Sequence, residues 1–229
     1  MGVSQHAFLD ELSRIHPPQQ DRSRLAQQAA LDAFEELLAE RPFAKVTVQE
    51  IADRANLSIT SLYARFDGKD ALVLALHERV IREGVAQLEV ALADDEIVEA
   101  PVDEIVAMLV DRTVAFAHAN AHVFRAVLTA ADDETNERAA AFLRLGSERI
   151  SSVLAPRLAT AATHAMRDID FAWRSLVAVL QQSWALGGAE PSRFPLSPSE
   201  LAKRLTQQFL MTIGHHADQH VRPTEQPTD

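Results

Sequence analysis

The chain has 229 residues and a formal net charge of -11 at pH 7, with 22 basic and 33 acidic side chains. It contains no cysteine, which excludes disulfides, thiolate metal sites and thiol catalysis. No apolar run approaches the roughly eighteen residues of a membrane span, and the segment before Leu25 is too polar for a signal peptide. We therefore expect a cytoplasmic protein without a membrane partner.

The composition favours helices, because only seven glycines occur and alanine and leucine dominate between the prolines. We predict an all-α chain with short connections. The first twenty residues form an N-terminal extension, in which Gln5 to Ile15 can make a short helix before Pro17. A supporting helix is then predicted from Asp21 to Glu40, where apolar side chains recur at helical spacing. These are Leu25, Ala29, Ala33 and Leu37, widened by Ala30, Phe34 and Leu38.

Residues 47–66 have the spacing of a helix–turn–helix. Thr47 is expected to cap a first helix ending at Ala55. Asn56 then stands at the reversal, where asparagine tolerates the left-handed conformation better than most residues do. Ser58 is expected to cap the second helix.

The second helix has an apolar face and a polar face. Leu62 and Phe66 lie four residues apart and are expected to pack inward. The hydroxyl and arginine side chains around Tyr63 then point outward, where they suit phosphate oxygens and base edges. A third helix is predicted to begin at Gly68 or Lys69 and to run to about Leu92.

Three motifs in this segment, at Thr47–Ala52, Leu57–Phe66 and Lys69–Leu72, resemble the DNA-binding domain of the TetR-type transcriptional regulators. Pro42 and Asn56 stand where that family usually has glycine. The resemblance implies an N-terminal three-helix DNA-binding domain, here 21–68, joined to a larger helical domain for ligand binding and dimerisation, here 69–217. The candidate DNA-binding residues are Thr47, Gln49, Ser58, Ile59, Thr60, Ser61, Tyr63, Arg65 and Lys69.

The charge of this segment differs from that of the whole chain. Residues 41–69 hold five cations (Arg41, Lys45, Arg54, Arg65, Lys69) against three acids (Glu50, Asp53, Asp67), or 5 − 3 = +2. A mildly basic patch on an acidic protein docks locally, and we expect weak non-specific affinity that depends strongly on salt. Ile59 is apolar and can contact only a thymine methyl group or a sugar.

The remaining helices are predicted at 102–119, 122–130, 133–162, 169–186 and 199–217, after an acidic loop at Asp94–Glu96. Pro156 is expected to kink or end the third of these near Ala155. The tail 218–229 is polar and expected to be disordered. Because an operator is usually bound by a symmetric dimer, the two last helices are the predicted dimer contact. Their interface candidates are Phe171, Leu176, Val179, Leu180, Leu201, Leu205, Phe209 and Ile213.

The resemblance also implies a small-molecule pocket in the larger domain. The candidate lining is Met108, Phe116, Phe124, Arg125, Phe142, Trp173 and Trp184, although each of these except Arg125 is individually more typical of plain core. Arg125 lies in the apolar segment HVFRAVL, and a buried guanidinium requires a partner. We favour an internal acid such as Asp111 over a carboxylate of an effector.

The histidines offer little for catalysis or metal binding. His118 and His122 would share a face if one helix ran through Asn120, but Asn120 can instead cap a new helix. With no third ligand evident, we predict no metal, no cofactor and no catalytic residue. His215, His216 and His220 are expected to be solvated near the frayed C-terminus.

The favoured hypothesis is therefore a homodimeric transcriptional regulator that binds a double-stranded DNA operator and, as a repressor, is released by a small-molecule effector. The alternatives are an all-helical enzyme or metal-binding protein that uses the histidines, and a helical interaction scaffold.

Overall fold

The computed structural model describes residues 21–93, 99–130, 133–186 and 192–214. The predicted all-α fold is confirmed, since these residues form α-helices and two 3₁₀ helices with no strand among them. Within the same residues, no helix is both long and apolar enough to cross a bilayer. The elements in chain order are α2 (Asp21–Glu40), η1 (Phe43–Lys45), α3 (Val48–Arg54), α4 (Ile59–Tyr63), α5 (Gly68–Leu92), α7 (Val102–Ala119), α8 (Ala121–Ala130), α9 (Asp133–Leu154), η2 (Ala155–Arg157), α10 (Ala162–Ala185) and α11 (Pro198–Thr212).

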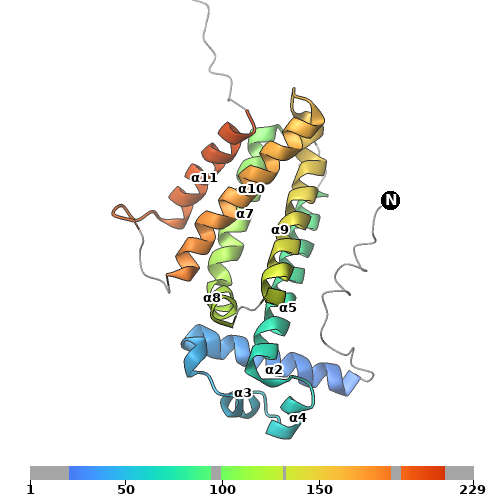
Figure 1. Cartoon of the computed structure of the whole chain (residues 1–229), viewed down its shortest axis with the longest axis vertical. Coiled ribbons are helices and arrows are strands. Elements are labelled where there is room, and N and C mark those ends of the chain that lie inside the picture. Colours follow the sequence, from blue (N-terminus) through green and yellow to red (C-terminus); the bar gives the residue numbers. More distant parts are fainter. Residues whose placement is uncertain (1–20, 94–98, 131–132, 187–191, 215–229) are drawn as a thin grey trace, which may run out of the picture.

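The molecule has a small head and a long body (Figure 1). We call α2, η1, α3 and α4 the head, and α7 to α11 the body. The helix α5 begins in the head and runs up beside α9 into the body. At the lower end of the body, α8 packs against both α2 and α5, and it is the main contact between body and head.

Two apolar cores hold these parts together. The first joins the head to α5 and α8, and its fully buried members include Phe34, Ile51, Leu62 and Leu72. The second lies within the body among α7, α9, α10 and α11. Leu25 departs from its predicted core role, because it is 63% exposed and the first buried residue of α2 is Ala30.

Several helix ends differ from the prediction. Pro156 lies in η2, directly after α9 ends at Leu154, as expected for a proline that removes an amide donor. The next helix begins at Ala162 rather than at Ile169, because Ala165 and Ile169, one turn apart, are both fully buried and extend the apolar face backward. The last helix ends at Thr212, short of the predicted residue 217, and Gly214 follows in the left-handed conformation with φ 69°.

Some predictions fall on residues outside the described ranges. These are the helix in the N-terminal extension, the acidic loop at 94–96, the three C-terminal histidines and the tail.

Candidate nucleic-acid interface and internal cavity

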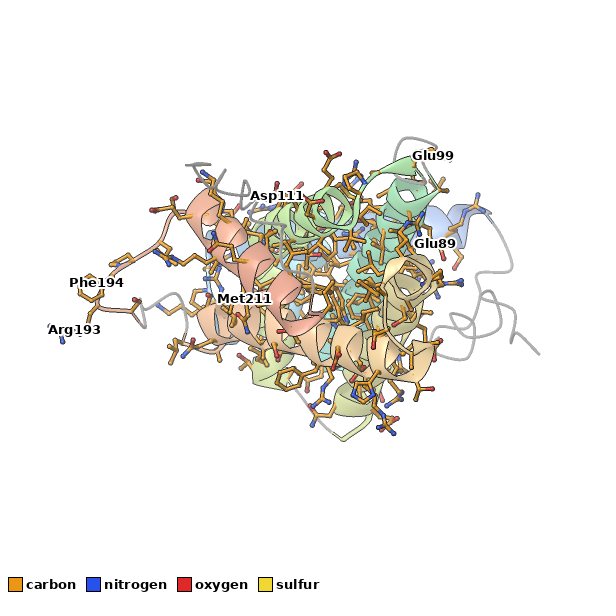
Figure 2. All side chains as sticks on the ribbon, turned by 90° about the horizontal axis from the view of Figure 1, so that it is seen from above. Glu89, Glu99, Asp111, Arg193, Phe194 and Met211 are labelled. Carbon is orange, nitrogen blue, oxygen red and sulfur yellow. The ribbon has the colours of Figure 1, made fainter. Side chains whose placement is uncertain are left out.

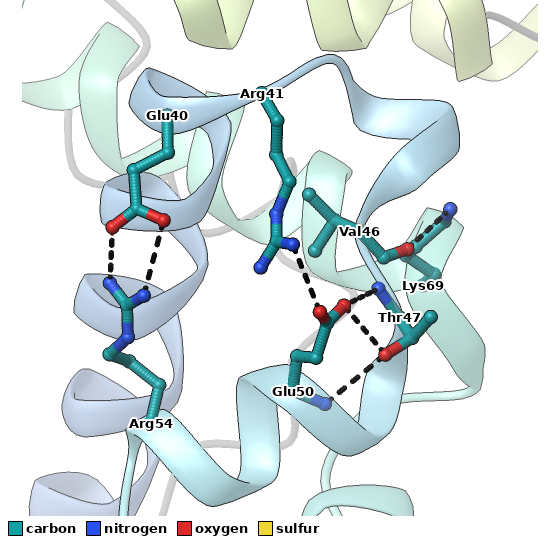
Figure 3. A network of polar contacts seen from close by, with 7 residues as sticks. All are labelled: Glu40, Arg41, Val46, Thr47, Glu50, Arg54 and Lys69. Atoms are coloured by element: carbon teal, nitrogen blue, oxygen red, sulfur yellow. Dashed lines mark hydrogen bonds and ion pairs between the residues drawn. The ribbon is translucent and has the colours of Figure 1, made fainter.

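The first helix of the helix–turn–helix is fixed by a capping box around Thr47, as Figure 3 shows. The Thr47 hydroxyl accepts from the backbone N–H of Glu50 at 3.3 Å, and the Glu50 carboxylate accepts from the Thr47 N–H at 2.9 Å. Arg41 lies 3.0 Å from the same carboxylate. The hydrogen bonds from Thr47, ahead of the Arg41 charge, hold the pKa of Glu50 below its ordinary value. The predicted cap is confirmed, and it gives α3 a rigid start.

The turn also follows the prediction. Asn56 adopts φ 54°, the left-handed conformation expected there. Ser58 caps α4 by accepting from the Ser61 N–H at 3.1 Å. Leu62 and Phe66 are 0% and 3% exposed, so that α4 is anchored to the head by its apolar face.

Six of the nine candidate DNA-binding side chains are exposed and three are half-buried. The exposed ones lie on α4, on α3 and at their caps: Thr47, Gln49, Ser58, Ile59, Thr60 and Tyr63. Gln49 donates to Asp53 at 2.8 Å, which fixes its amide on the α3 surface. The half-buried ones are Ser61, Arg65 and Lys69.

The expectation that Arg65 and Ser61 point straight outward is wrong. The Arg65 Nη1 folds back one turn and donates to the Ser61 carbonyl at 2.6 Å and to its hydroxyl at 2.8 Å. This contact satisfies a carbonyl at the end of the short helix α4, where no further turn can do so.

Lys69 is also turned inward, although it lies in the first turn of α5 as predicted. Its ammonium donates to the Val46 carbonyl oxygen at 3.0 Å (Figure 3). It also donates to the Phe43 carbonyl oxygen at 3.0 Å and lies 4.1 Å from the centre of the Phe43 ring. Lys69 therefore ties η1 to α5, and its charge is shared with the protein's own carbonyls.

The basic patch is consequently weaker than the count of +2 suggests. Arg54 is paired with Glu40 at 2.8 Å and with Glu36 at 3.3 Å. Of the five cations of residues 41–69, Lys45 is the one with no hydrogen bond or ion pair inside the described parts of the chain, and it is exposed. Lys45 was part of the predicted charge of +2 but not of the predicted interface, although its position two residues before the Thr47 cap was a signal for including it.

A polar junction joins the head to the body. Glu35 of α2 pairs with Arg79 of α5 and lies 3.7 Å from the Nε2 of His122 on α8. His122, ahead of Arg79, holds the pKa of Glu35 below its ordinary value of 4.5. This junction was not predictable from the sequence, because its members are far apart in the chain.

The ends of α7 and α8 show whether His118 and His122 share one helix. The helix α7 ends at Ala119 with Asn120 as its C-cap, and α8 starts at Ala121. His118 is exposed on α7, whereas His122 is half-buried against Glu35. No group of three or more candidate metal ligands occurs among the residues that the structure describes.

The body contains a cavity of about 800 Å³ between α5, α7, α8, α9 and α10. Of the predicted lining, Phe116, Phe124, Phe142, Trp173 and Trp184 line it. Met108 does not, because it packs against the second core.

Arg125 also lies outside the cavity, and the predicted internal pair with Asp111 is wrong. Both side chains are exposed. The inner face of α8 is made by its buried residues Val123, Phe124, Ala126 and Val127, which turns position 125 toward solvent. An exposed guanidinium needs no buried partner.

Aromatic rings form one wall of the cavity. Phe124 stacks on Trp184 with ring centroids 4.3 Å apart and meets the edge of Phe116 at 6.1 Å. Glycines at two positions leave room for the rings of Phe116 and Trp173. A Cβ at Gly84 would lie 2.8 Å from the Phe116 ring, and one at Gly146 would lie 2.8 Å from the Trp173 ring.

Most of the predicted dimer residues are used by the chain's own core. Leu176, Leu180, Leu205, Phe209 and Ile213 are at most 5% exposed in the single chain, so that they leave little surface for a partner. Val179 and Leu201 are half-buried and Phe171 is 60% exposed. Other apolar side chains are exposed nearby: Met211 on α11 is 69% exposed, and Phe194, on a segment extended away from the body in Figure 2, is 77% exposed.

Comparison with known proteins agrees with the resemblance seen in the sequence. Residues 30–76 match the model of the family described as bacterial regulatory proteins, tetR family. A search of curated protein sequences finds no match.

The fold is similar to those of solved regulators. A tetR-family transcriptional regulator from Streptomyces coelicolor aligns with a TM-score of 0.64 and 17% identity, over 82% of this chain and 79% of that one. The fatty acid degradation regulator FadR from Bacillus halodurans gives 0.59 and 17%, over 84% and 96%. A TetR/AcrR-family regulator from Thermobifida fusca gives 0.57 and 16%, over 86% and 100%. At these identities the likeness shows a shared fold.

Proposed function

Because this chain is a TetR-type transcriptional regulator with a DNA-binding helix–turn–helix, we propose that it acts as a homodimeric repressor released from its operator by a small-molecule effector. The observation that carries the proposal is the double role of α5. Its first turns, with Leu72 and Leu76, belong to the core of the head, and its later turns, from His77 to Val90, line the cavity. A molecule in the cavity therefore contacts the helix on which the head is mounted.

The DNA contact is proposed to centre on the exposed face of α4. Thr60 and Tyr63 protrude from a helix that is capped at Ser58 and anchored at Leu62, so that their positions are rigid. Short hydroxyls suit base edges and phosphates, and Lys45, two residues before the Thr47 cap, adds one exposed positive charge that has no ion pair among the described residues. Ser61, Arg65 and Lys69 act chiefly by holding this surface in place, through the contacts described above.

A dimer is required because one five-residue helix covers few base pairs. We place the partner on the outer faces of α10 and α11, around Phe171 on α10 and Met211 on α11. Two heads related by a twofold axis would then reach successive major grooves about 34–36 Å apart. An effector that favours another separation of the heads would lower operator affinity, and a coupling of about 1–3 kcal/mol suffices for a change of about 5- to 150-fold.

The proposal is tested by recovering the DNA that the full chain binds in a genomic pull-down and measuring its affinity by fluorescence anisotropy. We expect sequence-selective binding that Thr60→Ala alters in preference and that Tyr63→Ala weakens on all sequences. Equal affinity for the recovered DNA and for a scrambled duplex of the same length would instead favour the scaffold hypothesis.

A further inference from the structure

His77 is a buried side chain in the wall of the cavity that has no hydrogen-bond partner among the described residues. It lies on α5, is 8% exposed, and lines the cavity with its ring in a T-shaped arrangement with that of Phe124, at a centroid distance of 6.1 Å. It makes no hydrogen bond to any described residue, whereas the buried Trp173 Nε1 of the same wall donates to the Leu143 carbonyl at 3.1 Å. An unpaired imidazole of this kind is available to a ligand.

His77 is uncharged near neutral pH. Burial, followed by the nearby positive charge of Arg138, lowers the pKa of His77 from 6.5 to about 4. The neutral ring offers one N–H donor and one nitrogen acceptor, so that it can recognise a hydroxyl, an amine N–H or a carbonyl.

Of the other polar side chains around the cavity, Gln87 and Asn136 are exposed and Gln181 is half-buried. Thr113 and Asn120 donate to carbonyls of their own helix, at 2.7 and 2.9 Å. The formal charges of the lining are two acids, Glu83 and Glu89, and two arginines, Arg112 and Arg149, and Glu89 lies 3.6 Å from Arg149. The Arg149 Nε is buried without a hydrogen bond, but its charge is offset by Glu89, and Arg112 is exposed. A charged ligand would therefore find no buried counter-ion without a partner among the described residues of the wall, and burying an unpaired charge is costly.

The rest of the wall suits flat rings. Phe116, Phe124 and Trp184 present an array of faces and edges, and Trp173 closes the other side against Gly146. A volume of about 800 Å³ falls in the range of sites for drug-sized molecules.

We propose that the cavity binds a neutral, mostly apolar molecule that contains an aromatic ring and one group hydrogen-bonded to His77. This inference deepens the proposed function, on whose small-molecule effector it rests, by naming the chemical class. His77 directly follows Leu76, which is fully buried in the core of the head, so that a ligand at His77 contacts α5 where the helix leaves the head.

The test uses two fluorescent probes with the same ring skeleton. N-phenyl-1-naphthylamine is neutral and carries one N–H, and 8-anilino-1-naphthalenesulfonate adds a negative charge. Both are titrated into the full chain at pH 7.5, without DNA. We expect the neutral probe to bind at least about tenfold more tightly than the sulfonate, and to quench tryptophan emission because Trp184 lies in the wall.

Substitution of the histidine gives the second readout. His77→Phe keeps a ring against Phe124 but removes the nitrogen atoms, and should weaken binding of the neutral probe about three- to tenfold, the usual effect of one hydrogen bond. The matched control His118→Phe, on an exposed position outside the cavity, should leave the affinity unchanged. Should His77→Phe not fold, His77→Gln retains a hydrogen-bonding group and is expected to bind within about threefold of the wild type.

Two results would overturn the inference. One is wild-type affinity of the neutral probe for folded His77→Phe, or for His77→Gln a loss above about tenfold. The other is tighter binding of the sulfonate that Arg112→Ala abolishes, which would identify an anion site at the opening. Failure of the proposed function has a different signature, because loss of sequence-selective DNA binding would leave both titrations unchanged.

Discussion

The burial of His77 predicts a specific dependence of stability on pH. In the unfolded chain an imidazole titrates near 6.5, whereas burial in the folded chain lowers the pKa of His77 to about 4. Between these values the unfolded state binds the additional proton, so that the free energy of unfolding falls as the pH falls. The contribution of the neutral His77 side chain to the free energy of unfolding is fully present above pH 6.5 and is lost progressively as the pH falls toward 4.

The size of the effect follows from the same two values. Between pH 7 and pH 5 the linkage relation gives a loss of about 2 kcal/mol from this single group. The other charged side chains near His77 are present in all the variants that are compared. Burial raises the pKa of Glu78, despite the neighbouring Arg82 and Arg138, and this contribution has the opposite sign because the folded state then binds the proton more tightly.

The assay is urea unfolding of the wild type, His77→Phe and His118→Phe at pH 7, 6 and 5, followed by circular dichroism. We expect the wild type and the exposed-site control to lose stability in parallel, and His77→Phe to lose about 2 kcal/mol less over the interval. If the slopes of His77→Phe and the wild type agree within error, the imidazole is not buried in its neutral form and the argument fails.

Three further predictions concern the DNA contact, the dimer and the cavity. Lys45→Ala should weaken binding similarly on all sequences and reduce the slope of log affinity against log salt by about 1, measured by anisotropy over a salt series; an unchanged slope removes Lys45 from the interface. Phe171→Glu places a charge on the outer face of α10 and should shift the protein from dimer to monomer in sedimentation, whereas Arg125→Glu, at an exposed position of α8, should not. Gly84→Ala puts a Cβ 2.8 Å from the Phe116 ring and should cost about 1–3 kcal/mol of stability in urea unfolding, because the ring must move into the cavity; a neutral result would show that the ring moves freely.

The sequence was most informative where the determinants are local. The Thr47 cap, the left-handed Asn56 and the Ser58 cap each depend on residues within about four positions, and the structure has all three. The same holds for Pro156, which acts on the turn before it.

Contacts between distant segments were not predictable in the same way. Lys69 was placed at the start of its helix, but nothing in the local pattern showed that its ammonium would reach the Phe43 and Val46 carbonyls. Arg125 sits in an apolar run, yet α8 buries only one side, and helical phase alone did not settle which side faced the core. The junction of Glu35 with Arg79 and His122 depends on how three helices pack.

The continuous apolar core beneath the helix–turn–helix limits how such a regulator can be recombined. Val123, Phe124, Ala126 and Val127 of α8 belong to the same cluster as Phe34 and Leu72, so that a cut after residue 68, the predicted domain boundary, passes through packed side chains. A chimaera that joins a foreign DNA-binding segment to this body would have to match the inner surface of α8 as well as the sequence at the junction. The smallest segment that can be exchanged between two proteins is therefore defined by which side chains pack together. It includes residues of α8, which follow the cut after residue 68 by more than fifty positions.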